Sequence, residues 1–285
     1  MKHIPVRHIN TSQKEPDLAG SFSIRDLADL LEGKDLVQEL HRHDFFLALA
    51  IKKGSGSHAI DFTPYPIDDH TIFLMRPGQV HQLSLNKDTT GYLLQFRADF
   101  FASHDSAAGQ FSRKAFQHNF YQLDGAGFEK MLGLLAYIYQ EYTVKPQNYQ
   151  EVIKANMAIF FIELTRRIDH VTAGKVNLYR QEKLETFLAL LESQICTHKQ
   201  VAQYAGMLNL SVYQLNAITK EALGKTCSRL IDEQIILEAK RCLLANTSQV
   251  NQVAYSLGYE DVSYFIRFFK RHTGYSPEAF RQNFS

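Results

Sequence analysis

Apolar positions change their spacing along the chain, and the change predicts two kinds of structure. Between about residues 37 and 100, short apolar runs at 45–51, 72–75 and 92–96 are separated by turn residues. Runs of this length and spacing indicate a β-sandwich or β-barrel. The Gly54-Ser55-Gly56 stretch is predicted as a hairpin turn.

After residue 125, apolar residues recur three and four positions apart, which predicts amphipathic helices at 128–142 and 152–168. Each of these helices would have a broad apolar face, which either packs on the barrel of the same chain or pairs with a second copy of the chain. The residues that form the two faces are Leu132, Leu135, Ile138, Tyr139, Tyr142, Ile153, Met157, Phe160, Phe161 and Leu164.

The C-terminal third carries one pattern twice, at 201–220 and at 253–270. Each copy has a small alanine, an apolar residue three positions later, and then a residue that tolerates positive φ, Asn209 or Gly258. An apolar anchor follows, Leu215 or Phe265. This is the layout of a helix-turn-helix, and two copies predict two helices inserted into successive segments of the DNA major groove. A long helix over 228–244 would fix the distance between them.

The predicted outer faces of the two second helices carry the candidate DNA contacts. Ser211 and Asp261 are placed to cap these helices. Arg267 suits guanine and Asn216 suits adenine, because each can form two parallel hydrogen bonds to that base. The candidate base contacts are Tyr213, Asn216, Ala217, Val262, Ser263, Ile266 and Arg267; the candidate backbone contacts are Ser211, Lys220, Lys270 and Arg271.

Charge and composition narrow the classes of protein without naming one. The chain of 285 residues has a net charge of +1, and from residue 181 onward 11 basic residues oppose 10 acidic ones. DNA binding therefore depends on where the charges lie. Neither an apolar run long enough to cross a membrane nor a secretory signal is seen, which predicts a cytoplasmic protein without membrane contact. The three cysteines are expected to be reduced, buried thiols.

Histidines supply the most distinctive chemistry of the N-terminal half. A His41-Arg42-His43 stretch and a Pro77-to-His81 stretch resemble the metal motif of cupin barrels, and alternation places His41 and His43 on one strand face. The glutamate usual in that motif is replaced by Leu47, so we expect structural or ligand-contacting histidines, with no metal and no cofactor. His58 and His70 are expected at the surface. The candidate effector-binding residues are His41, His43, Phe45, Phe73, Arg76, His81 and Gln95.

The C-terminal third resembles the DNA-binding domain of the AraC/XylS family of bacterial transcription regulators. The residues that carry the resemblance are Ala205 to Lys220, Gly224, Ala239-Lys240-Arg241, Leu244, Val253-Ala254, Leu257-Gly258-Tyr259-Glu260-Asp261, Ser263-Tyr264-Phe265, Arg267, Phe269-Lys270, Gly274-Tyr275-Ser276-Pro277 and Phe280-Arg281. The family's base-contacting positions correspond to the seven base contacts named above. Three departures are Thr219 in place of a usual phenylalanine, Ala217 in place of an arginine in some relatives, and Phe280 in place of a frequent tyrosine.

The resemblance implies an α+β multidomain chain, in which a cupin-like sensor barrel and two helices precede an all-α domain of two helix-turn-helix units joined by a long helix. It implies an effector-responsive activator that binds double-stranded DNA as a homodimer through the two helices after the barrel. It further implies a small effector, with an organic acid as our guess, and contact with RNA polymerase. The expected organisation is an arm (1–20), the barrel (21–125), a dimerisation segment (126–169), a linker (170–180) and the DNA-binding domain (181–285).

Two other functions stay open at this point. A metal-dependent cupin enzyme would need a catalytic ion on His41, His43 and His81 with an open coordination position. An effector-independent repressor or architectural protein would bind DNA without responding to any metabolite. The absent fourth ligand and the duplicated DNA-binding pattern favour a regulator without enzyme activity.

Overall fold

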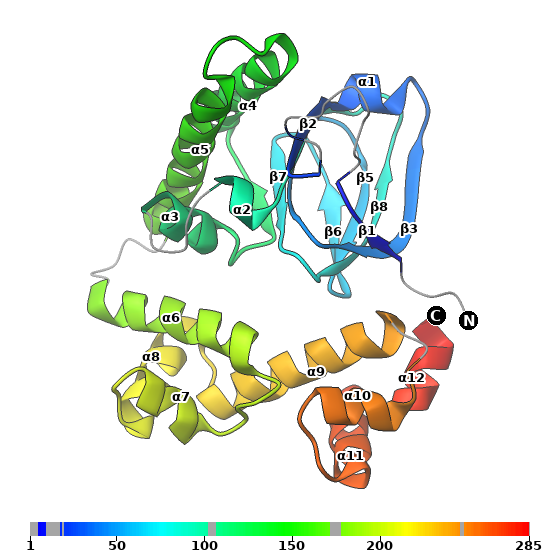
Figure 1. Ribbon diagram of the computed structural model, residues 1–285, viewed down its shortest axis with the longest axis vertical. Coiled ribbons are helices and arrows are strands. Elements are labelled where there is room, and N and C mark those ends of the chain that lie inside the picture. Colours follow the sequence, from blue (N-terminus) through cyan, green and yellow to red (C-terminus); the bar gives the residue numbers. More distant parts are fainter. Residues whose placement is uncertain are drawn as a thin grey trace. The chain divides into compact units, whose positions relative to one another are not determined.

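A computed structural model shows the fold of two units. It describes residues 5–9, 18, 20–101, 107–171, 178–245 and 248–284. The chain divides into two compact units at Thr172 and Ala173, the first β-rich and the second all-helical (Figure 1).

The dividing point falls inside the predicted linker 170–180. The described ends of that stretch are helical, since α5 (Tyr149–Val171) reaches into it and α6 (Leu178–Gln194) begins in it. Residues 172–177 lie outside the described part of the chain.

The described part of the N-terminal unit contains two five-stranded sheets, with strand orders β1-β3-β8-β5-β6 and β10-β7-β4-β9-β2. All strand pairs given for them are antiparallel except β1 with β3. The strands are β1 (Val6–Arg7), β2 (Phe22–Asp26), β3 (Leu36–His43), β4 (Phe46–Lys53), β5 (Gly56–Ile60), β6 (Thr63–Ile67), β7 (Thr71–Met75), β8 (Val80–Leu85), β9 (Thr90–Phe96) and β10 (Phe120–Gln122).

The continuous apolar runs of the sequence are strands buried on both faces. In β4, Leu47 and Leu49 join the core between the sheets, while Ala48 and Ala50 join a second core beneath the helices. Successive side chains of a strand point to opposite faces, so one run serves both cores. Phe73 and Leu74 of β7 divide in the same way.

The predicted hairpin turn at 54–56 is wrong. β4 and β5 belong to different sheets, so Gly54 to Gly56 form a crossover between sheets. The hairpin lies at the next connection, between β5 and β6, where Asp61 and Phe62 have φ of 47° and 67°. Neither residue is a strong signal for left-handed backbone, which is why the pattern missed this turn.

Part of the predicted loose arm is ordered into the sheet. Val6 and Arg7 form β1 and pair in parallel with Arg42 and His43 of β3. Most of the arm, residues 1–4, 10–17 and 19, lies outside the described part of the chain.

Within its described residues, the N-terminal unit has five helices beside the sheets: α1 (Leu27–Leu31), α2 (Ala98–Phe101), α3 (Ala107–Ala115), α4 (Gly125–Val144) and α5. The two predicted helices are confirmed as α4 and α5. Eight of the ten residues of their predicted faces are buried in the second core with Ile24 and Ala48, and the other two, Leu132 and Tyr139, pack against it as partly buried side chains. The apolar faces therefore cover the barrel of the same chain, and dimerisation through the two helices stays a prediction.

The C-terminal unit repeats one arrangement, a short helix, a turn and a longer helix. Its helices are α6, α7 (Val201–Met207), α8 (Val212–Leu223), α9 (Cys227–Ala245), α10 (Val250–Ser256), α11 (Val262–Thr273) and α12 (Pro277–Phe284). Asn209 and Gly258 have φ of 55° and 74°, as the pattern predicts. Ala205 and Ala254 are buried, and α9 is the predicted connecting helix.

Two expectations from composition can be compared with the structure. Within the part of the chain that the structure describes, no helix combines the length and the apolar content needed to cross a bilayer. The three cysteines are free thiols; Cys227 is buried, while Cys196 and Cys242 are only half-buried.

Candidate DNA interface and effector cavity

The first candidate recognition helix, α8, begins at a complete capping box. The Ser211 hydroxyl accepts from the Gln214 backbone N–H at 3.2 Å, and the Gln214 side chain accepts from the Ser211 backbone N–H at 2.8 Å. Such a cap fixes the first turn, where base contacts are made. Tyr213 in that turn is 83% exposed. Lys220, about two turns further along α8, is also exposed.

Asn216, a predicted adenine contact, is hydrogen-bonded within the C-terminal unit. Its Oδ1 accepts from the Cys227 backbone N–H at 3.0 Å, and its Nδ2 donates to the Val212 carbonyl at 3.1 Å. The Oδ1 contact holds the start of α9 against α8, while the Nδ2 contact stays within α8. The adenine contact by Asn216 stays a prediction, beside Tyr213 and the half-buried Ala217 as base-contact candidates on this helix.

The second candidate recognition helix, α11, separates an aromatic core from a basic outer face. Phe265, Phe268 and Phe269 are buried. The outer face carries exposed Ser263, Arg267, Lys270 and Arg271, with Val262 and Ile266 half-buried between core and solvent.

The Asp261 carboxylate makes two kinds of contact with α11, a helix cap and an ion pair. It accepts from the Ser263 and Tyr264 backbone N–H groups at 2.8 and 3.1 Å, as the predicted cap. It also lies 3.9 Å from the Arg267 guanidinium. This ion pair between exposed side chains is weak and can be exchanged for a contact to DNA.

The turn before α11 is held by the first helix-turn-helix unit. The Lys199 ammonium donates to the Cys196 carbonyl at 3.0 Å and to the Gly258 carbonyl at 3.3 Å. A Cβ on Gly258 would lie 2.0 Å from the Cys196 carbonyl oxygen. The two helix-turn-helix units therefore meet at Gly258. Sequence reasoning identified this residue only as a site of positive φ.

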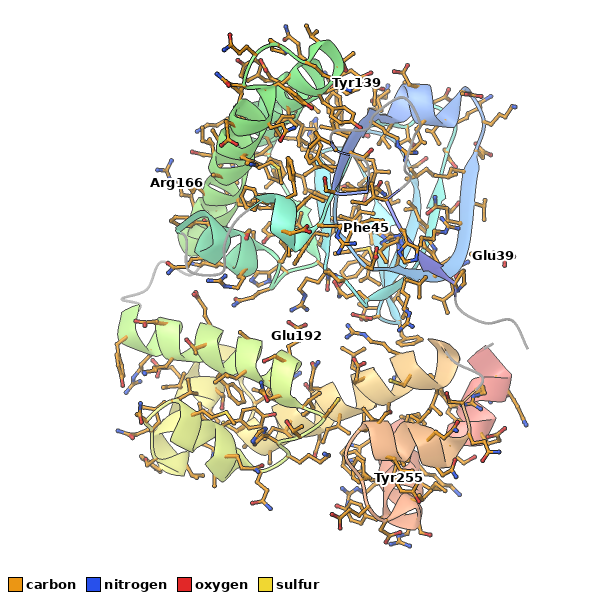
Figure 2. All side chains as sticks on the ribbon, viewed as in Figure 1. Glu39, Phe45, Tyr139, Arg166, Glu192 and Tyr255 are labelled. Atoms are coloured by element: carbon orange, nitrogen blue, oxygen red, sulfur yellow. The ribbon has the colours of Figure 1, made fainter. Side chains whose placement is uncertain are left out.

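A cavity of about 230 Å³ lies within the barrel unit. Of the predicted effector residues, His43, Phe45, His81 and Gln95 line it; His41, Phe73 and Arg76 are not among its lining residues. Figure 2 marks Phe45 in the interior of the unit. Sequence reasoning missed Arg7 on β1 and Arg25 on β2, since no pattern shows that these segments meet at the cavity. The full lining is Arg7, His8, Arg25, Leu27, Leu30, Leu36, Gln38, His43, Phe45, Leu47, Leu49, His81, Leu83, Leu85, Leu93 and Gln95.

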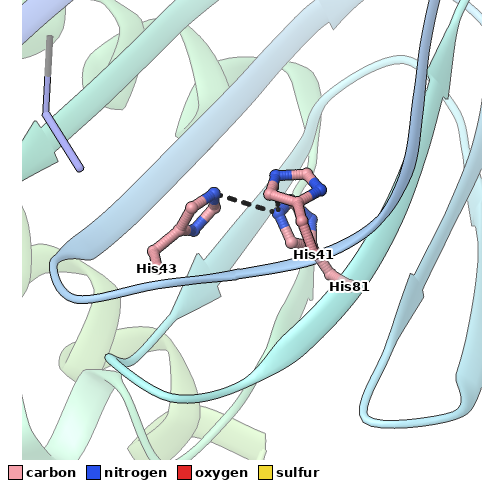
Figure 3. A group of neighbouring side chains, drawn as sticks. All are labelled: His41, His43 and His81. Carbon is pink, nitrogen blue, oxygen red and sulfur yellow. Dashed lines mark hydrogen bonds between the residues drawn. The ribbon is translucent and has the colours of Figure 1, made fainter. Parts of the chain in front are cut away.

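Four buried histidines form a chain, of which His43 and His81 line the cavity. His81 Nε2 lies 2.9 Å from His41 Nε2 and 3.2 Å from His43 Nε2 (Figure 3). His81 Nδ1 lies 2.8 Å from His58 Nε2. The expected surface position of His58 is therefore wrong, since its side chain is buried beside Phe73. His70 is half-buried against Phe128.

Burial keeps these imidazoles uncharged at neutral pH. Desolvation is the main cause throughout, and it lowers the pKa of His41 to about 4 and the pKa of His43 and His58 to about 3. The pKa of His81 also lies well below its usual value. The neighbouring histidines and Arg7 lower these pKa values further. Neutral imidazoles have lone pairs that can accept a hydrogen bond or bind a metal ion.

Comparisons with known proteins cover both units. A helix-turn-helix domain model matches residues 204–283, and an AraC-like ligand binding domain model matches residues 34–142. The chain is 23% identical over 250 residues to the HTH-type transcriptional activator RhaS of Pectobacterium atrosepticum, covering 85% of this chain and 86% of that protein. It is also 23% identical over 248 residues to RhaS of Escherichia fergusonii, covering 85% and 87%. The solved structure of ToxT from Vibrio cholerae O395 matches 93% of this chain and 98% of its own, at 15% identity and a TM-score of 0.44.

Proposed function

The chain belongs to the AraC/XylS family of transcription regulators, and we propose that it is an effector-responsive activator that reads DNA with α8 and α11. The observation that carries this proposal is the pair of capped helices, each preceded by a left-handed turn and each exposing its outer face. Helices presented in this way by one rigid unit fit successive segments of the major groove.

We assign base reading mainly to α11. Arg267 is exposed, carries a planar guanidinium with several donors, and among the described residues forms an ion pair only with the exposed Asp261. Ser263, Val262 and Ile266 complete the base-reading face, with Tyr213, Asn216 and Ala217 on α8. Ser211, Lys220, Lys270 and Arg271 would contact phosphates, which supply affinity without sequence information.

Arg267 and Lys270 lie on the same exposed face of α11, but their alanine variants are expected to lose DNA affinity in different ways. Arg267→Ala should weaken binding to a selected genomic fragment by about 1–3 kcal/mol and relax preference at one base position, because a bidentate base contact is lost. Lys270→Ala should weaken all sequences similarly and reduce the slope of log affinity against log salt by about one. Fluorescence anisotropy over a salt series, with specific and random duplexes, measures both.

Each variant serves as the control for the other. A loss that is the same on specific and random duplexes for Arg267→Ala would contradict its base contact. A loss confined to the specific duplex for Lys270→Ala would contradict its phosphate contact.

The barrel cavity is the proposed effector site. Its lining within the described residues includes Arg7 and Arg25 and contains no carboxylate, while leucines and Phe45 supply most of the remaining surface. A small organic acid with an apolar body fits these properties, since charged groups pair and apolar groups fill the rest. The volume of about 230 Å³ restricts it to a small metabolite. Its effect on DNA binding must come from unequal affinity for two conformations of the regulator.

The proposed activity implies two further partners, a second copy of the chain and RNA polymerase. The exposed Tyr137 of α4 and Ile159 of α5 are apolar side chains left uncovered on the outer side of the helix pair, and we propose that homodimerisation uses them. A dimer would present four recognition helices to a repeated DNA site. An activator of this kind would act in the cytoplasm, on the chromosome, through contact with RNA polymerase and without catalysing a reaction.

A further inference from the structure

The histidine cluster is more than a set of hydrogen-bonded core residues, because three of its nitrogens converge on one point. We propose that His41, His43 and His81 bind a divalent transition-metal ion of the zinc class in the wall of the barrel cavity, with His58 and the Glu39 carbonyl orienting two of the ligands. This inference concerns the barrel alone and goes beyond the proposed DNA-binding function.

The spacing of the nitrogens fits a tetrahedral ion. Three nitrogens bound at 2.0–2.1 Å in tetrahedral geometry lie about 3.3 Å apart. The Nε2 atom of His81 lies 2.9 and 3.2 Å from those of His41 and His43, and the ligand atoms of all three residues lie within 4.8 Å of one another. An ion requires the Nε2 atoms of His81 and His41 to move slightly apart and the ligand atoms of His41 and His43 to take up the same spacing.

For two of the three ligands, His41 and His81, the other ring nitrogen has the support that metal-bound histidines require, whereas Nδ1 of His43 has no hydrogen-bond partner. His41 Nδ1 lies 2.7 Å from the Glu39 carbonyl, which can only accept, so His41 carries its proton on Nδ1 and has a lone pair on Nε2. His81 Nδ1 can likewise donate to His58 Nε2 at 2.8 Å. The Nε2 atom of His81 then carries a lone pair, next to the lone pair on Nε2 of His41. Hydrogen bonds of this kind fix the tautomer and the ring orientation of histidines that bind metals.

Without an ion, the tautomer of His81 decides whether the cluster is satisfied. If His81 donates from Nδ1 to His58, two Nε2 lone pairs face each other at 2.9 Å. If His81 instead donates from Nε2 to His41, this conflict is absent; Nδ1 of His58 has no hydrogen-bond partner in either arrangement. A cation shared by the three Nε2 atoms removes the first conflict.

The proposed metal site is open to the barrel cavity on one side. His43 and His81 line the cavity, so an ion could enter from there. Leu47, which also lines the cavity, occupies the place of the usual carboxylate ligand, so the chain supplies three ligands and leaves a fourth position to water or to an anionic group.

Direct metal binding by the untagged, full-length chain tests the proposal. After removal of metals with a chelator, equilibrium dialysis against Zn²⁺ should give one tightly bound ion per chain, and Co²⁺ should give the visible absorption of a tetrahedral site. His43→Phe should lower the affinity more than about 100-fold, because it removes a ligand while keeping a ring that can stack on Phe45. His58→Ala should lower it by about 10–100-fold, because it removes only the support of His81.

Two comparisons separate this site from adventitious binding. His118→Ala removes another histidine of the barrel unit and should leave the affinity unchanged. Far-ultraviolet circular dichroism and DNA binding of each variant establish that it is folded. Equal zinc affinity in the native chain and in folded His43→Phe, or an octahedral Co²⁺ spectrum, would overturn the proposal, whatever the outcome for DNA binding.

Discussion

Replacing Gly258 by alanine is expected to destabilise the C-terminal unit by about 2–5 kcal/mol and to abolish specific DNA binding at physiological temperature. The left-handed backbone at φ 74° costs a non-glycine residue about 1–2 kcal/mol. The added Cβ would lie 2.0 Å from the Cys196 carbonyl oxygen and 2.7 Å from the Lys199 ammonium. Because a backbone atom must move, the overpacking adds about 1–3 kcal/mol. Calorimetric unfolding of the full-length chain measures the loss.

Gly224→Ala is the matched control. Gly224 also has a left-handed backbone, with φ of 67°, but a Cβ there would meet nothing within 4 Å. Its substitution should cost only the conformational penalty, about 1–2 kcal/mol. Equal losses in the two variants would show that the contact between the two helix-turn-helix units at Gly258 contributes nothing.

Acidification from pH 7 to pH 5 is expected to destabilise the barrel unit by on the order of 5 kcal/mol in a buffer that contains a chelator. His41, His43, His58 and His81 all have a folded-state pKa lowered by burial, to about 4 or about 3 for the first three. In the unfolded chain they titrate near pH 6.5. Below that pH the unfolded state binds more protons, so this stability is present above pH 6.5 and is lost as the pH falls toward the folded-state values.

His43→Phe separates the histidines from other acid-sensitive groups. With one titrating group removed, the dependence of barrel stability on pH should become shallower by about 1.4 kcal/mol per pH unit between pH 6 and pH 5. Urea unfolding at several pH values measures these slopes, and a variant that keeps the full native slope would contradict the assignment to buried histidines. The C-terminal unit contains none of the four histidines and serves as an internal reference.

The DNA-binding unit could be predicted almost completely because its signals are local. Caps such as Ser211 and Asp261, and left-handed positions such as Asn209 and Gly258, are set by residue type and short spacing. What sequence reasoning missed there depends on tertiary contact. Asn216 lies at a solvent-facing position of its helix by periodicity, yet its amide is bonded to the start of α9.

The barrel was predictable as a class but less so in detail. Its apolar runs indicate strands, although they do not show that one sheet is buried on both faces and that α4 and α5 cover it. His58 lies on a short strand far from the His41 motif in sequence, so only the pairing of β5 with β8 brings it to His81. Arg7 and Arg25 reach the cavity for the same reason, through strand pairing between distant segments.

A footprint of the full-length protein on a genomic fragment that it has selected is the most direct test of the two-helix mode of binding. Hydroxyl-radical and guanine-methylation protection should show, for each bound chain, two protected segments of the major groove about 10 base pairs apart. Protection of a single segment per chain, or no preference for any fragment over random competitor DNA at moderate salt, would contradict the proposal that α8 and α11 read DNA together.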